Sequence, residues 1–77
     1  MFTASIAYFR RIIQYTHIQK NYGSVYVRVG NGTNYRAITT LKAGMTFDHV
    51  ATARNGWNAI AVNGQVGWVS GKYSAII

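Results

Sequence analysis

The hydrophobic and polar positions follow two different periods on either side of Gly23. Before this glycine, apolar residues recur at the spacing of one helical stripe, formed by Phe2, Ile6, Phe9 and Ile13. This spacing predicts an amphipathic helix over about residues 3–20, although its many β-branched and aromatic residues are weak helix formers. We therefore expect residues 1–22 to form an N-terminal helix or linker segment.

Beyond Gly23 the period shortens to two residues, which is the period of a strand with one buried face. In Ser24–Val29 the valines alternate with Tyr26 and Arg28, so we expect the valines on one face and the other two side chains on the opposite face. Further runs of the same character are expected as strands, namely Tyr35–Leu41, Met45–Ala53, Trp57–Val62 and Gln65–Ser70.

Tight turns separate these runs. Asn55-Gly56 and Asn63-Gly64 each lie between apolar runs, and Asn-Gly is favoured in type I′ hairpin turns because both central residues take a positive φ. Lys42-Ala43-Gly44 supplies another turn with a glycine free to adopt such a φ. The sequence therefore predicts a mainly β fold, a small, closed or nearly closed antiparallel barrel of about five strands over residues 23–77, preceded by the N-terminal amphipathic helix.

Charge narrows the classes of function. The 77 residues carry eight Lys and Arg against the single acid Asp48, which gives a net charge of +7 and a pI near 10.3. This excess suits a polyanionic partner, such as nucleic acid, an anionic membrane or a cell wall that bears teichoic acid. It also disfavours an enzyme, because acid–base catalysis commonly needs two titratable groups with matched roles.

The same composition limits targeting and cross-linking. Cysteine is absent, so there is no disulfide and no thiolate metal site. No apolar run approaches the ~20 residues that a membrane-spanning helix needs. The basic pair Arg10-Arg11 follows the N-terminal apolar stretch, whereas a secretory signal peptide has its basic residues first. We therefore expect no membrane span and no recognisable signal peptide in this chain.

Motifs for catalysis or cofactors are weak. Gly30-x-Gly32 lacks the third glycine and the following helix of a dinucleotide site. Asp48 and His49 are neighbours in a predicted strand and point to opposite faces, so the acid is not placed to orient the histidine in a catalytic triad. With His17 they supply the residue types of a two-histidine, one-carboxylate metal site, but without paired i, i+4 histidines. We expect no catalytic residue, no metal and no cofactor.

Five motifs follow one another along residues 23–77 with compatible spacing. They are Val25-Tyr26-Val27-Arg28 with its glycine-containing loop and Tyr35, Lys42-Ala43-Gly44, Asn55-Gly56-Trp57, Asn63-Gly64, and Gly67-Trp68-Val69 followed by Lys72-Tyr73. In this order they resemble a bacterial SH3 domain. The resemblance implies that the predicted barrel is SH3-like.

The resemblance also implies a function. Domains of this kind are attached to peptidoglycan hydrolases of bacteria and their phages, including endolysins and autolysins, and hold the catalytic domain on the wall. The implied function is a non-catalytic, cell-wall-binding module that recognises peptidoglycan through its glycan strands or peptide cross-bridges. The implied place of action is the bacterial cell wall, outside the cell.

In the SH3-like topology, the first long loop, the turn before Trp57 and the C-terminal segment surround one groove. Aromatic rings stack on sugars and extended peptides, and asparagine amides bond to acetamido or peptide groups. The expected ligand-binding residues are Tyr26, Asn31, Asn34, Tyr35, Trp57, Asn58 and Tyr73. For Trp57 and Trp68, ordinary packing in and around a small barrel is the alternative.

Two other functions stay open on the sequence alone. A protein-interaction or oligomerisation module would use residues 1–22 as its interface. A nucleic-acid-binding barrel would combine stacking rings with cations, but the basic residues here are scattered along the chain and form no run. For Arg28, the alternative to a solvent-exposed surface charge is a structural role, in which the stem of its side chain packs across the barrel.

Overall fold

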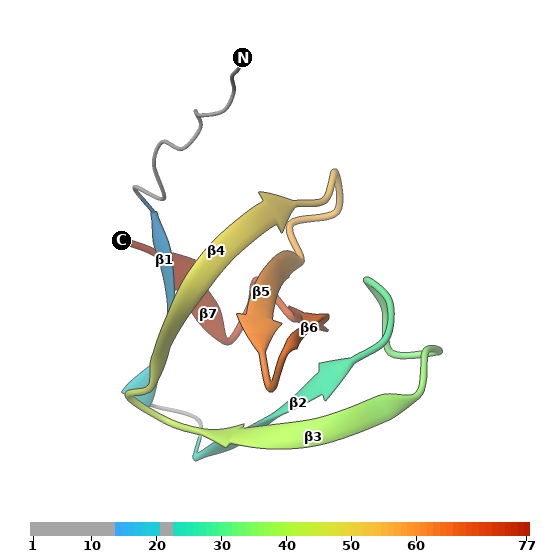
Figure 1. Cartoon of the computed structure of the whole chain (residues 1–77), viewed down its shortest axis with the longest axis horizontal. Coiled ribbons are helices and arrows are strands. Elements are labelled where there is room, and N and C mark those ends of the chain that lie inside the picture. The colour runs from blue at the N-terminus through green and yellow to red at the C-terminus, as the bar shows by residue number, and fades with distance from the viewer. Residues whose placement is uncertain (1–13, 21–22) are drawn as a thin grey trace.

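The computed structural model describes residues 14–20 and 23–77, and these residues form a sheet of seven antiparallel strands (Figure 1). The strands are β1 (Tyr15–Ile18), β2 (Ser24–Arg28), β3 (Ala37–Lys42), β4 (Thr46–Thr52), β5 (Asn58–Val62), β6 (Gln65–Val69) and β7 (Ser74–Ile76). Five of them, β2 to β6, lie within one or two residues of the strands expected from the alternating pattern. The mainly β prediction is confirmed, and the strand number of about five was too low.

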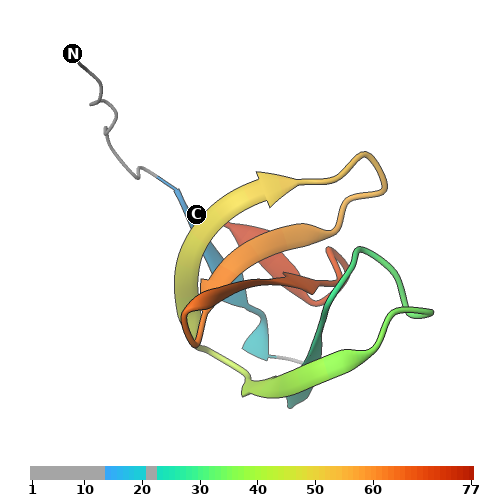
Figure 2. The same cartoon turned by 45° about the vertical axis from the view of Figure 1, so that its right-hand side comes forward.

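The sheet is curled but open. Its strand order is β3-β2-β6-β5-β4-β1-β7, with β3 and β7 at the two ends. Figure 2 shows how β4, β5 and β6 curve around the interior while β2 and β3 cross below them. The prediction was of a closed or nearly closed barrel, and the sheet is not closed. A single ladder pair, Arg28 with Trp68, joins β2 to β6, and β3 lies beyond β2.

Strand β1 corrects the prediction of a helix over residues 3–20. Tyr15–Ile18 pairs with β4 on one side and with β7 on the other. Thr16 and Ile18 are fully buried and their neighbours are more exposed, which is the period of a strand. The backbone N–H and C=O groups of this segment bond to two partner strands. This pairing outweighs the helical spacing of the apolar residues, so the segment is a strand. The remainder of the predicted helix lies outside the described residues, except residues 14, 19 and 20, which are not α-helical.

The core lies inside the curl. Its buried apolar residues come from five of the strands and are Ile18, Val25, Val27, Leu41, Ile60, Val62 and Val69, with Ile38, Phe47 and Tyr73 packed against them. Val25 and Val27 face inward as expected. Val29 does not continue their face, because the pairing of β2 with β3 shifts register between Val27 and Arg28 and the strand ends there.

The turns agree with the sequence in two places and differ in a third. Asn63 and Gly64 both have positive φ, 53° and 77°, as a two-residue type I′ turn requires. Gly44 also has a positive φ, 89°. At Asn55-Gly56 only the glycine has a positive φ. Here Gly56 N donates to Ala53 O, so the strands are joined by a longer loop with a left-handed glycine and not by a two-residue turn. The prediction of a type I′ turn was wrong here.

A chain of hydrogen bonds between polar side chains crosses the sheet. His49 bonds through Nδ1 to Thr16 Oγ1 (2.9 Å) and through Nε2 to Thr52 Oγ1 (3.2 Å). Thr52 Oγ1 donates to Asn58 Oδ1 (2.9 Å), and Asn58 Nδ2 donates to Ser74 Oγ (2.9 Å). The chain therefore links β1, β4, β5 and β7.

Within residues 14–20 and 23–77, no helix is long and apolar enough to cross a membrane.

Candidate ligand-binding groove

A groove of about 300 Å³ opens beside strand β2. Its walls come from β2, from the loop 29–36, from the residue that precedes β5 and from the loop between β6 and β7. The lining residues are Val25, Tyr26, Arg28, Thr33, Trp57, Ser70, Lys72 and Tyr73. This set combines three aromatic rings with two cations and no acid.

Separate stretches of chain bring the three rings together. Tyr26 points outward and is 58% exposed, because its neighbours Val25 and Val27 are drawn into the core. Trp57 follows the β4–β5 loop, and its backbone N–H donates to Asn55 Oδ1 (3.2 Å). Tyr73 directly precedes β7 and is half-buried against the core.

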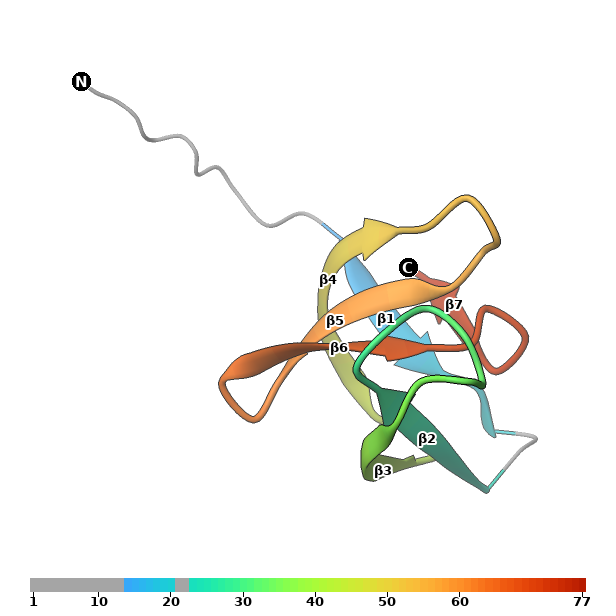
Figure 3. The same ribbon diagram turned by 90° about the vertical axis from the view of Figure 1, so that its right-hand side faces the viewer.

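The loops around the groove are fixed to one another. Asn55 Nδ2 donates to the Asn31 carbonyl (2.9 Å), which joins the β4–β5 loop to the loop 29–36. Gly71 lies so close to the Gly56 carbonyl that a Cβ at position 71 would collide with it. Figure 3 shows the three loops on the same side of the molecule. Backbone contacts therefore set the width of the groove.

Each cation of the groove lies over a tyrosine ring. The Arg28 guanidinium carbon is 5.2 Å from the centroid of Tyr26, and Lys72 Nζ is 5.7 Å from the centroid of Tyr73. Both distances are within the ~6 Å range of cation–π attraction. Arg28 Nη1 also donates to the Tyr35 carbonyl (2.9 Å), so this arginine holds the loop 29–36 onto β2.

A second hollow adjoins the first. It has a volume of about 310 Å³ and is lined by Ser24, Val25, Tyr26 and Tyr73. Three of these residues also line the groove, so the two hollows lie next to each other beside Tyr26 and Tyr73. A ligand long enough to occupy both hollows would pass these two rings.

The structure brings some of the sequence-predicted site residues together and leaves others apart. Tyr26, Trp57 and Tyr73 line the groove. Tyr35, Asn31 and Asn34 lie on the loop that borders it without lining it. The Tyr35 ring is folded over Gly30, where an added Cβ would lie only 2.5 Å from it, and its other face is exposed to solvent.

Asn58 does not line the groove. Its side chain is buried, with 4% exposure, and both ends of its amide are used by Thr52 and Ser74. The sequence places Asn58 next to Trp57, but successive strand residues point in opposite directions. Asn58 therefore turns into the polar chain inside the sheet.

Four polar groove residues, Arg28, Thr33, Ser70 and Lys72, were not predicted as site residues. Thr33, Ser70 and Lys72 reach the groove from loops whose paths depend on contacts between distant residues. One signal for Lys72 was available, because Lys72-Tyr73 places a cation next to a ring that was expected in the groove.

The residues considered for metal binding or catalysis are dispersed. His17 Nδ1 bonds to Thr46 Oγ1 (3.2 Å), His49 belongs to the polar chain, and Asp48 is exposed on β4. Among the residues that the structure describes, no three His, Cys, Asp or Glu side chains form a group able to hold a metal ion. The groove is the better candidate site.

Comparison with known proteins identifies the family of this chain. A comparison with curated proteins gave no match. A family model described as bacterial SH3 domain matches residues 23–75, a range that covers strands β2 to β6 and all the groove residues. Domains of this family are of the binding type, generally non-catalytic, and generally bind proteins or cell walls. By this match the chain belongs to the bacterial SH3 domain family.

Proposed function

We propose that the protein is a non-catalytic module that binds the bacterial cell wall through peptidoglycan. The observation that carries the proposal is the groove lined by Tyr26, Trp57 and Tyr73, with a second hollow beside Tyr26 and Tyr73. Bacterial SH3 domains often act at the cell wall or outside the cell. We therefore place the action of this chain at the wall, as a targeting domain of the kind attached to endolysins or autolysins.

The groove suits the chemistry of peptidoglycan. Ring faces contact the apolar faces of sugars and the backbone of extended peptides, and they lose little conformational entropy on binding because a tyrosine has few rotatable bonds. Asn31, Asn34 and Tyr35 border the groove on its loop, where they extend the contact surface for the ends of a ligand. A glycan strand or a peptide cross-bridge is long enough to occupy the groove and the hollow beside it.

The test compares two exposed tyrosines. Tyr26→Ala removes a groove ring, whereas Tyr15→Ala removes a ring that is 43% exposed on β1 and does not line the groove. We expect Tyr26→Ala to weaken co-sedimentation with purified sacculi about tenfold, the size of effect that a central aromatic contact has at an interface. Tyr15→Ala should bind as the wild type does.

Salt separates wall binding from nucleic-acid binding. A nucleic-acid protein loses affinity steeply between low and high salt because it releases counterions from phosphates. Wall binding through stacked rings should change little over the same range. The proposal fails if the chain does not bind sacculi and instead binds single-stranded DNA with a steep salt dependence. It also fails if Tyr26→Ala and Tyr15→Ala bind sacculi equally well.

A further inference from the structure

The cations of the groove have no carboxylate side chain of this protein to pair with. Arg28 and Lys72 line the groove, and no acid does. Asp48 is the only acidic side chain in the sequence, and it lies on β4, opposite Tyr15 of β1. The positive charge of the groove is therefore available to a ligand.

The two cations differ in their freedom. Arg28 is held between the ring of Tyr26 and the carbonyl of Tyr35, so part of its donor capacity is used inside the protein. Lys72 is exposed on the β6–β7 loop, and among the described residues its ammonium has no ion-pair partner. An ammonium group carries three donors. Lys72 is therefore the cation that is best placed to meet a ligand.

We propose that Lys72 makes the groove selective for ligands that carry an anionic group, a carboxylate or a phosphate, beside the ring of Tyr73. This inference rests on the proposed function and names the chemistry that the groove selects. In a cell wall the anionic group is a carboxylate of a stem peptide or a phosphate of an attached polymer. A neutral sugar or a bridge of uncharged residues alone would leave Lys72 unpaired.

The position of Lys72 favours this role on physical grounds. Lys72 is exposed and its ammonium nitrogen lies 5.7 Å from the centroid of the Tyr73 ring, so an anion attracted to Lys72 would lie beside that ring. The attraction is still that of a partly exposed pair, and salt screens it. The expected effect is therefore a modest gain in affinity and a clear preference between charged and neutral ligands.

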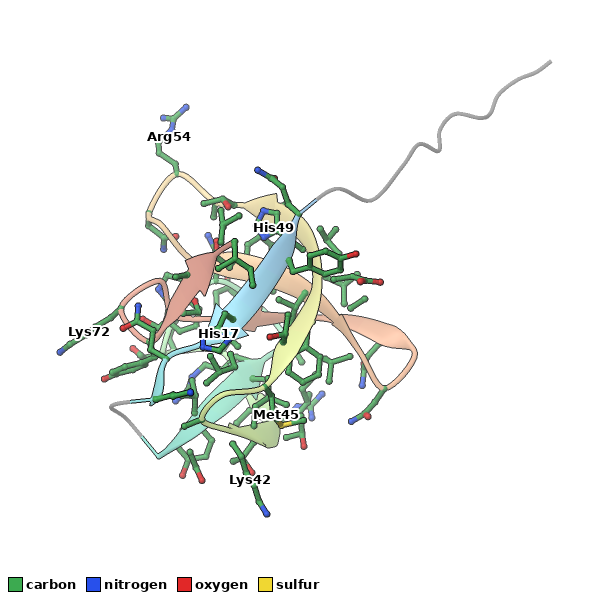
Figure 4. All side chains as sticks on the ribbon, turned by 90° about the vertical axis from the view of Figure 1, so that its left-hand side faces the viewer. His17, Lys42, Met45, His49, Arg54 and Lys72 are labelled. Carbon is green, nitrogen blue, oxygen red and sulfur yellow. The ribbon has the colours of Figure 1, made fainter. Side chains whose placement is uncertain are left out.

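The experiment uses two lysine variants of the whole chain. Lys72→Met removes the charge in the groove, and Lys42→Met removes one charge from an exposed position on β3 that does not line the groove. Figure 4 shows the two lysines projecting from different parts of the molecule. Both are exposed, so we expect both variants to fold, and a thermal melt checks this.

Each variant is titrated with three preparations of sacculi at low salt. One is untreated, one has its carboxylates amidated with carbodiimide and methylamine, and one has its phosphate polymers removed with hydrofluoric acid. We expect Lys72→Met to lower the affinity for untreated sacculi about two- to fivefold, and Lys42→Met to lower it less. One of the two treatments should abolish the difference between wild type and Lys72→Met, and that treatment identifies the anion as carboxylate or phosphate.

The outcomes separate this inference from the proposed function. If wild type binds all three preparations equally and Lys72→Met equals Lys42→Met, while Tyr26→Ala still weakens binding, the selectivity is refuted and the wall-binding function stands. If the difference at Lys72 persists after both treatments, the inference is also refuted. A wild-type chain that binds none of the preparations overturns the proposed function and this inference together.

Discussion

Replacement of Gly71 by alanine should disturb the groove without changing any residue that lines it. Gly71 lies against the backbone of Gly56, and a Cβ at position 71 would overlap the Gly56 carbonyl oxygen and lie 2.9 Å from its carbonyl carbon. Both obstructing atoms belong to the backbone, so no side-chain rotation relieves the collision. Trp57 follows Gly56, and Ser70, Lys72 and Tyr73 flank Gly71, so the two loops carry four groove residues between them.

The size of the effect follows from the contact distance. Non-bonded carbon atoms settle at ~3.5–4.0 Å, so the two loops must separate by about 1 Å to admit the methyl group. Overpacking of this kind costs about 1–3 kcal/mol in the free energy of unfolding. A domain of this size changes its melting temperature by about 4–8 °C for each kcal/mol, so we expect a fall of about 5–20 °C. Because Gly71 has no positive φ, backbone strain does not add to this cost.

The assay is thermal and urea unfolding combined with sacculus co-sedimentation below the transition. Gly64→Ala is the control, because its φ of +77° makes alanine strained there while its surroundings are open. That variant should lose stability, by about 1–2 kcal/mol for a left-handed alanine, and keep its affinity. Gly71→Ala should lose both. Unchanged stability and unchanged affinity in Gly71→Ala would refute the contact between the loops as the feature that sets the width of the groove.

Two further substitutions test the interior. Asn58→Ala leaves the hydroxyl groups of Thr52 and Ser74 without their amide partners, and it should cost about 1–3 kcal/mol in urea unfolding, whereas exposed Asn34→Ala should cost less than about 0.5 kcal/mol. Gly67→Ala places a methyl group on the Val27 side chain and 3.3 Å from Val62 Cγ1, so calorimetry should show a lower melting temperature from about 1–3 kcal/mol of overpacking. An unaltered melting curve in either variant would contradict the packing described for that residue.

Local alternation of side chains was sufficient to predict the central strands. Each of β2 to β6 has five or more residues, and β-branched or aromatic side chains alternate along most of that length, so the pattern is legible without tertiary information. The Asn63-Gly64 turn is equally local, because its two residue types match the two positive φ values that the hairpin needs.

The two terminal strands could not be predicted in the same way. Strand β1 has four residues and β7 has three, and neither is long enough to show a clear period of two. For β1, the helical spacing of the apolar residues before Tyr15 also favoured a different conformation. Their strand character comes from pairing with each other and, for β1, with β4. The same pairings extend the sheet at one end. Because β1 was not predicted, neither the number of strands nor the open form of the sheet was predicted.

Three of the four rings expected in the groove line it, whereas Tyr35 only borders it and none of the predicted asparagines lines it. Tyr26 follows from the parity of β2, and Trp57 follows from its place after a turn. Asn58 was misplaced because the partners that draw it inward, Thr52 and Ser74, are brought close only by the fold. Polar side chains have many local orientations, and their hydrogen bonds to residues distant in sequence decide which of these is adopted.

The two sides of strand β2 show how a small sheet can carry a candidate binding surface without weakening its core. The core uses the inward side of β2, and the groove uses the outward side of the same strand, so Val27 and Tyr26 have different roles one residue apart. Arg28 then holds the neighbouring loop while it covers the Tyr26 ring. Loss of the Tyr26 ring should therefore reduce binding more than stability, whereas loss of Arg28 should reduce both, because only the arginine is bonded to the loop that borders the groove.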